Sequence, residues 1–407
     1  MVLRLYRNFR LIWIGQVVSV IGDGMQRVAL LWWARQFGGN GLLTAVALST
    51  IIPAVLCSPL GGWLADRFDR RRLMMTADLG RVGLTIALAV SVIDNHPTPL
   101  LMCLLIAMSS MCAAVFDPTY SAVVPTLIDS KHRAAANGLN MANSAVGGLV
   151  GPLVGGVLIS LFDVGSVMVI NAVTFVWSAV FVAFARVPKP LGATAASRNR
   201  HSTVDAMLSI VRDRELRRLV GLASVLNMVA APVPLLVVAL AIDRFRVGAA
   251  GYGMLEVMVS IGILAGSLMA GKVAKGAIAG PMLLTGLCLA SAGLVPIIVT
   301  ATAFIVGGFA IAIANTSLIT SLQNVVAPQV QGRVFGTIGA LGEGLRPAGL
   351  ALGAPLLATL GVSGAFLVVG AGVVLATLMW GRRVGLPKLA SFLAVDQPDH
   401  LHVVGQD

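Results

Sequence analysis

Long apolar stretches, separated by short polar turns, run along almost the whole of this 407-residue chain. Most are roughly 20 to 27 residues long, which lets a helix cross a hydrocarbon core about 30 Å thick. Each stretch must be helical, because lipid offers the backbone no hydrogen-bond partners. The pattern predicts twelve spans, at residues 10–34, 42–65, 73–94, 98–126, 134–161, 164–187, 219–242, 250–273, 280–300, 302–326, 334–359 and 363–382.

One polar segment, residues 188–218, interrupts this rhythm and divides the spans six and six. The chain is therefore predicted to be an all-α membrane protein with two six-helix bundles, at residues 1–187 and 219–383. Within the segment, Ser202 and Asp205 form a potential capping pair, and apolar residues follow at helical spacing. We expect an amphipathic helix on the cytoplasmic membrane surface there, and a disordered cytoplasmic tail at 384–407.

Composition supports this reading, because 57% of the residues are hydrophobic and 11% are charged. Soluble domains carry about 25% charged residues. A net charge of +12 would suggest nucleic acid as the partner of a soluble protein, but here the basic residues are sorted by side. Of the 29 lysines and arginines, Arg35, Arg244 and Arg246 fall on the side opposite the termini. The positive-inside rule then predicts a multi-pass protein of the plasma or inner membrane with both termini in the cytoplasm, and no nucleic-acid partner.

The chain shows no residue pattern for catalysis, metal binding or nucleotide binding. Its four cysteines lie in apolar spans at no metal-ligand spacing, and its five histidines fall outside the spans. No phosphate-binding loop of the form G-x-x-x-x-G-K-[ST] occurs. We therefore predict no enzyme activity, metal or cofactor, and any transport must draw its energy from a gradient.

After the second span, residues 62–72 read G-W-L-A-D-R-F-D-R-R-R. A glycine such as Gly62 lets helices approach closely, the Asp66 carboxylate suits a helix N-terminus, and arginines can bridge to it. This run resembles the signature of the major facilitator superfamily between spans 2 and 3, although Asp69 stands where that family usually has glycine. The D-R-F-D-R-R variant resembles the branch of macrolide-efflux and siderophore-export proteins. The fold implied is two pseudo-symmetric bundles.

The resemblance implies a gating cluster at one end of the first bundle. Asp66 would contact the start of span 11, and Arg70 would reach an acid in span 4, for which Asp117 is the best match. The alternative is that the arginines only obey the positive-inside rule. The cluster comprises Gly62, Asp66, Arg67, Arg70, Arg71, Asp78, Arg81 and Asp117.

Span 5 resembles the antiporter signature of the same superfamily, which is carried chiefly by exporters. Small residues four apart give a flat helix face for close packing, and a proline supplies a bend. The residues are Gly147, Gly151, Pro152, Gly155 and Gly156.

Charged residues inside spans cost about 2.5 to 3.5 kcal/mol on insertion scales, so each is a functional hypothesis. Asp23 and Arg27 are four apart in span 1, and Glu343 and Arg346 are three apart in span 11, so each pair can share a helix face. Glu256 stands alone near the outer end of span 8. These five are the proton-coupling candidates, and static structural ion pairs are the alternative.

Polar uncharged residues within the spans could line a cavity between the halves, where this fold binds substrate. Interhelical hydrogen bonds are an equally good explanation for each. The candidates are Gln16, Gln26, Asn140, Asn143, Asn171, Asn227, Asn315 and Gln323.

We therefore predict a secondary transporter that exports an amphipathic small molecule, such as a drug, macrolide or siderophore, by proton antiport with alternating access. Its partners would be substrate, protons and the lipid bilayer, and we expect a monomer. An uptake, uniport or lipid-translocating carrier of the same fold is one alternative. A non-transporting membrane receptor or assembly protein is another, and the buried charges argue against it.

Overall fold

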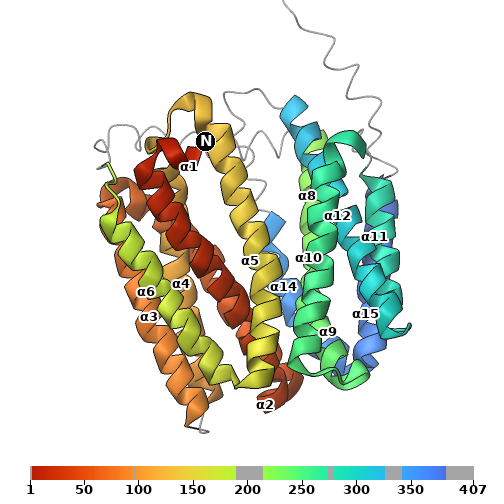
Figure 1. Ribbon diagram of the computed structural model, residues 1–407. Coiled ribbons are helices and arrows are strands. Elements are labelled where there is room, and N and C mark those ends of the chain that lie inside the picture. Colours follow the sequence, from red (N-terminus) through yellow and green to blue (C-terminus); the bar gives the residue numbers. More distant parts are fainter. Residues whose placement is uncertain (1, 95–97, 189–213, 274–277, 326–341, 382–407) are drawn as a thin grey trace, which may run out of the picture.

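The computed structural model describes residues 2–94, 98–188, 214–273, 278–325 and 342–381 (Figure 1). Every regular element within these ranges is a helix. The first group comprises α1 (Val2–Leu5), α2 (Arg7–Arg67), α3 (Arg70–Ile93), α4 (Pro99–Val123), η1 (Val124–Thr126), η2 (Ser130–His132), α5 (Arg133–Leu161) and α6 (Val164–Phe184). The second comprises α8 (Arg214–Ala230), α9 (Val233–Ala239), η3 (Leu240–Phe245), α10 (Gly248–Val273), α11 (Ala279–Ala292), α12 (Ile297–Val325), α14 (Arg346–Ala351) and α15 (Gly353–Gly381).

Two glycines divide the apolar helices α2 and α15 into separate spans. Within α2, Gly39 has φ 62°, and within α15, Gly361 has φ 65°, a left-handed conformation that glycine adopts without a Cβ penalty. Nine helices in the described ranges are long and apolar enough to cross a membrane. When α2 and α15 are counted as two spans each and the shorter α11 is added, they correspond to the twelve predicted spans, of which the eleventh is described only from residue 342. The chain is a multi-pass membrane protein.

The turn between spans 9 and 10 was predicted in the wrong place. The apolar pattern put it at residues 300–302, whereas α11 ends at Ala292 and α12 begins at Ile297. Leu294 N donates to Ser291 O at 2.8 Å, and Thr300 Oγ1 donates to Ala292 O at 2.9 Å. Pro296, which cannot donate a backbone hydrogen bond, directly precedes α12 and favours a helix start over a helix interior.

The helices form two groups that lie side by side (Figure 1). On one side α2 packs against α4, α5 and α6, and α3 packs against α4 and α6. On the other, α10 packs against α12, and α11 packs against α12 and α15. We call these groups the N-terminal and C-terminal halves. The boundaries predicted for the two bundles, at residues 187, 219 and 383, remain predictions. Most of the predicted linker and tail lies outside the described residues.

The halves meet mainly at the end of the molecule away from the N-terminus, which we call the opposite end. The largest cluster of buried apolar side chains lies there and draws on α2, α9, α10 and α15. Trp32 of α2 stacks on Tyr252 of α10, with ring centroids 6.1 Å apart. The cluster joins the two halves across a close-packed apolar contact.

Candidate functional site

A cavity of about 540 Å³ lies between the halves. Its walls come from α2, α3, α4 and α5 of the N-terminal half and from α9 and α14 of the C-terminal half. Four of the charged residues singled out in the sequence line it: Asp23, Arg27, Arg81 and Arg346. Tertiary packing therefore gathers charges from helices that are far apart along the chain.

Asp23 forms its ion pair with Arg81 of α3, and not with Arg27 as predicted from helix spacing. The Arg81 side chain is 10% exposed, and its guanidinium lies over the ring of Phe175, 3.8 Å from the centroid. Both the carboxylate and the ring face stabilise the positive charge of a guanidinium at this position. The side chains at residues 23 and 27 instead reach different helices.

Arg27 pairs across the two halves with Glu256 of α10, at 3.6 Å. The sequence had placed Glu256 alone, but its side chain is only 16% exposed and lies against this arginine. The arginine is 55% exposed and lines the cavity. This ion pair links the halves directly, so its strength depends on how the halves are arranged.

Glu343 and Arg346 form the predicted pair within one helical turn, with Oε2 and Nη1 2.9 Å apart. Both side chains are partly exposed, at 47% and 40%. Of the three ion pairs around the cavity, this one has the geometry that sequence spacing alone anticipated.

Between the cavity and the opposite end of the molecule, the two halves are closely packed. Arg35 of α2 contacts Asp243 of η3 at 2.5 Å, and the backbone N–H of Ala250 donates to Ser160 Oγ at 3.1 Å. Ser260 of α10 donates to Gly148 O at 2.9 Å, about halfway along α5. Polar contacts thus tie the halves together from the opposite end to mid-helix.

The span 5 glycines pack two faces of α5 at backbone distance. An added Cβ on Gly151 would lie 2.7 Å from Gly24 Cα, and one on Gly155 would lie 2.8 Å from Met25 Cα. Gly156 faces the other way, where a Cβ would lie 2.5 Å from Ala249 O of α10. The predicted flat faces therefore contact α2 within one half and α10 across the halves.

Near the end of α2, Gly61 makes a close helix approach. A Cβ on Gly61 would collide with Ala114 O of α4, whereas among the described residues no atom lies within 4 Å of a Cβ on Gly62. Asp69, the residue that departs from the family signature, caps α3 by accepting from Arg72 N at 3.1 Å.

The gating arginines bind backbone carbonyls more than carboxylates. Arg70 donates to Ala65 O at 3.1 Å and to Ala122 O at 3.2 Å, and lies 3.9 Å from Asp66. It therefore reaches the end of α4 but does not pair with the predicted Asp117. Arg71 donates to Ala183 O of α6, and Arg67 lies over the Trp63 ring. The predicted partner of Asp66, the start of span 11, lies outside the described residues.

A layer of hydrogen-bonded polar side chains fills the interior of the N-terminal half. Gln16 donates to Ser178 Oγ at 2.9 Å, and Ser178 donates to the buried carboxylate of Asp78 at 2.7 Å. Nearby, Asn171 donates to Gln26 Oε1 at 2.5 Å. Asp78, a member of the predicted gating cluster, therefore lies buried in the interior of the half.

The predicted cavity residues are divided among three environments. Gln26 lines the cavity between the halves. Gln16, Asn140 and Asn171 make interhelical hydrogen bonds, Asn140 as the acceptor from Tyr120, and Asn143 is buried. Asn227 and Asn315 line a second cavity, and the side chain of Gln323 lies outside the described residues.

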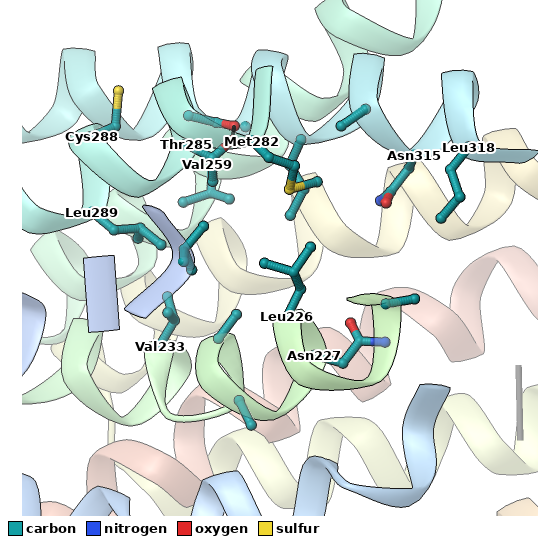
Figure 2. A pocket seen from close by; sticks show the side chains of 18 of the residues that line it. Leu226, Asn227, Val233, Val259, Met282, Thr285, Cys288, Leu289, Asn315 and Leu318 are labelled. Carbon is teal, nitrogen blue, oxygen red and sulfur yellow. Dashed lines mark hydrogen bonds between the residues drawn. The ribbon is translucent and has the colours of Figure 1, made fainter. Parts of the chain in front are cut away.

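This second cavity, of about 580 Å³, lies inside the C-terminal half (Figure 2). Its wall is mostly apolar, with Leu226, Met282 and Leu289 directed into it from α8 and α11. The sequence singled out Asn227, Asn315, Glu343 and Arg346 of its lining but did not indicate a separate cavity here, because the other lining residues look like ordinary membrane-helix residues. The Ser109–Ser110 pair that lines the first cavity was also missed, and a polar doublet within an apolar span was its only signal.

Comparison with known proteins places the chain among transporters. The family model of the Major Facilitator Superfamily matches residues 12–345. Macrolide efflux protein A of Streptococcus pyogenes is 24% identical over 383 residues, covering 90% of this chain and 94% of that protein. The enterobactin exporter EntS of Shigella boydii serotype 4 (strain Sb227) is 25% identical over 372 residues, covering 88% and 86%.

Solved structures show the same fold. A bacterial homologue of the iron transporter ferroportin, in an inward-facing state, superimposes with a TM-score of 0.75 at 13% identity, covering 93% of this chain and 99% of that chain. The nucleoside transporter NupG gives 0.73 at 15% identity, covering 92% and 99%.

Proposed function

This chain belongs to the major facilitator superfamily, and from that premise we propose that it exports an amphipathic small molecule by proton antiport with alternating access. The observation that carries the proposal is the charged cavity between the halves, with an ion pair that crosses from one half to the other. The efflux named for the relatives supports the direction.

Protonation would act through the ion pair between Arg27 and Glu256. In the described arrangement this pair helps to hold the halves together, alongside the contact of Arg35 with Asp243 at the opposite end. A proton on Glu256 removes the carboxylate charge and weakens its attraction to Arg27. The equilibrium then shifts toward a state in which the halves are apart at the opposite end. The pair between Asp23 and Arg81 offers a second proton site within one half.

The orientation in the membrane is part of the proposal. The concentration of basic residues on the side of the termini supports a cytoplasmic location for both ends of the chain. The described arrangement, packed closely at the opposite end, would then be an inward-facing state ready to load substrate from the cytoplasm.

The test measures proton flux in inverted membrane vesicles with an established ΔpH. Lipophilic cations, macrolides and catecholate siderophores are added in turn, and we expect at least one to collapse ΔpH in the wild type. Glu256→Gln and Asp23→Asn each remove one candidate proton site, and we expect one of them to abolish the collapse. Asp163→Asn is the matched control, because Asp163 caps α6 away from the cavity and asparagine caps equally well.

Each contrary outcome identifies what is wrong. Collapse that survives both substitutions would move proton coupling to another acid. If no compound collapses ΔpH in the wild type although substrate flux persists, antiport is wrong, and uniport or lipid translocation takes its place. Absence of any flux would favour a receptor or assembly role.

A further inference from the structure

The two cavities adjoin, and they differ in the number of charged side chains that line them. Ala231, Pro234 and Arg346 line both of them. Both cavities have mostly apolar walls, but Asp23, Arg27, Arg81 and three serines add charged and hydroxyl groups to the cavity between the halves, whereas the charged residues that line the other cavity are Glu343 and Arg346. At their junction the partly exposed guanidinium of Arg346 is the shared charged group. A molecule placed across this junction would meet a charged region at one end and an apolar one at the other.

The charges that line the inter-half cavity are unequal. Arg27, Arg81 and Arg346 line it with one carboxylate, Asp23. Arg27 and Arg346 also pair with Glu256 and Glu343, which are not part of its lining. Arg81 already binds that carboxylate, so Asp23 is poorly placed to attract a cation. Arg27 and Arg346 are 55% and 40% exposed. Each has five N–H donors, and the Glu343 contact of Arg346 engages only Nη1. They therefore retain donors for an incoming anion.

The apolar cavity has the dimensions of a ligand site. Small-molecule sites generally measure about 300 to 1,000 Å³, and its 580 Å³ falls within that range. Figure 2 shows Leu226 and Val233 on one wall opposite Met282 and Val259 on the other. An apolar group entering this space would leave water or lipid for a wall of aliphatic and thioether side chains.

We propose that the substrate is an amphipathic molecule with an anionic head group and an apolar body. Arg346 and Arg27 bind the head group between the halves, and the body occupies the cavity inside the C-terminal half. This inference rests on the proposed transport function, and it narrows the substrate class from amphipathic compounds in general to amphipathic anions. Cationic amphipaths of equal size bind more weakly, because the exposed guanidinium of Arg27 repels them while its carboxylate partner Glu256 is only 16% exposed.

The experiment measures direct binding of two probes that share one body. The probes are 4-(1-pyrenyl)butyrate and 4-(1-pyrenyl)butyl-trimethylammonium, which differ in head-group charge. The full chain is placed in phosphatidylcholine nanodiscs, and the fluorescence of empty nanodiscs is subtracted. We expect the anionic probe to bind at least about tenfold more tightly than the cationic one, since a charge-assisted hydrogen bond contributes at least that much.

Two substitutions separate the roles of the cavities. Arg346→Gln should weaken the anionic probe by about tenfold and leave the cationic probe unchanged or slightly tighter, and Arg346→Lys should restore part of the loss. Leu226→Trp fills the apolar cavity and should weaken both probes. The matched controls are Arg244→Gln, on an arginine that binds Ser363 away from both cavities, and Leu268→Trp, on a side chain 76% exposed on the outer surface of α10.

Three results would overturn the proposal. One is wild-type preference for the cationic probe, or equal binding of the two. Another is unchanged binding of the anionic probe in both Arg346→Gln and Leu226→Trp. The third is no binding of either probe.

Two further comparisons separate the source of the ligand and the coupling mechanism. Displacement of the anionic probe by added phosphatidylglycerol would identify an anionic lipid as the occupant, and resistance to displacement would identify a soluble amphipathic anion. Binding is measured without a proton gradient. A positive binding result with no ΔpH collapse in vesicles would therefore contradict proton antiport but not the assigned substrate class. Collapse driven by cations together with failed anion binding would contradict only the assigned substrate class.

Discussion

The two halves of this transporter share a helical architecture but fill their interiors differently. The interior of the N-terminal half is crossed by hydrogen bonds and an ion pair, such as Ser178 to Asp78 and Arg81 to Asp23. The C-terminal half instead encloses an apolar cavity of about 580 Å³. Dense polar packing resists deformation, and an apolar cavity accepts a ligand body. Similar folds thus differ in interior chemistry, with hydrogen-bonded polar side chains in one half and an apolar cavity in the other.

Removing the buried guanidinium should give the largest effect. Arg81→Gln leaves the carboxylates of Asp23 and Asp78 without their positive neighbour, and breaking such a pair should cost about 2 to 3 kcal/mol of stability. Arg346→Gln, on the partly exposed pair in the other half, should cost less than about 1 kcal/mol. Thermal unfolding of the purified variants in detergent measures both.

A double variant controls for this interpretation. Arg81→Gln combined with Asp23→Asn should be more stable than Arg81→Gln alone, because the uncompensated carboxylate is removed. Equal losses for Arg81→Gln and Arg346→Gln would mean that the halves do not differ in the way described.

The next largest difference between the halves is expected when a larger side chain is introduced into each interior. A Cβ at Gly22 would collide with the side chains of Asn171 and Thr174 in the polar layer, so Gly22→Ala should cost about 1 to 3 kcal/mol. Leu226→Trp adds far more volume but directs it into the apolar cavity, and we expect a loss below about 1 kcal/mol. Unfolding temperatures test this, and a larger loss for Leu226→Trp would contradict the contrast in packing.

The smallest effect is expected at the surface of the N-terminal half. Tyr6 donates to Asp129 Oδ2 at 2.7 Å, and this hydrogen bond raises the pKa of the Tyr6 phenol above its ordinary value of 10.0. Because the pKa of Tyr6 is raised in the folded state, this hydrogen bond contributes its stabilisation below pH 10. The stabilisation is lost as the pH rises through the folded-state pKa of Tyr6.

Tyr6→Phe should therefore differ from wild type by a small, constant amount between about pH 6 and 9, and the difference should vanish at higher pH. Unfolding temperatures measured across this pH series provide the test. A difference that changes between about pH 6 and 9 would contradict the assignment of this stabilisation to the Tyr6 phenol.

Much of the architecture could be predicted from local pattern. Apolar length gave the twelve spans, and the G-x-L-A-D-R run gave the superfamily, which the family model and the efflux-named relatives confirm. The glycines at 39 and 361 separate spans where the pattern broke. The turn before α12 was misplaced, because the residues from Gly293 to Thr302 are apolar or small and a hydropathy window averages over them.

The candidate site was less predictable, because helix spacing fixes only neighbours on one helix. Glu343 and Arg346 pair as their spacing predicts. Asp23 and Arg27 have equally suitable spacing, yet each finds its partner on another helix. The positions of Gly61 and Gly62 differ by one residue, about 100° around the helix, and only the packing shows that Gly61 is the one that faces α4.

The sequence by itself determined that this chain spans a membrane repeatedly, belongs to the transporter superfamily and carries charges at depth, because hydropathy, motif and composition are local properties. Only the tertiary structure decided which charges meet, that Arg27 and Glu256 link the halves, and that one half holds an apolar cavity. Pairing and empty volume depend on how helices face one another, and that information is distributed over the whole packed molecule.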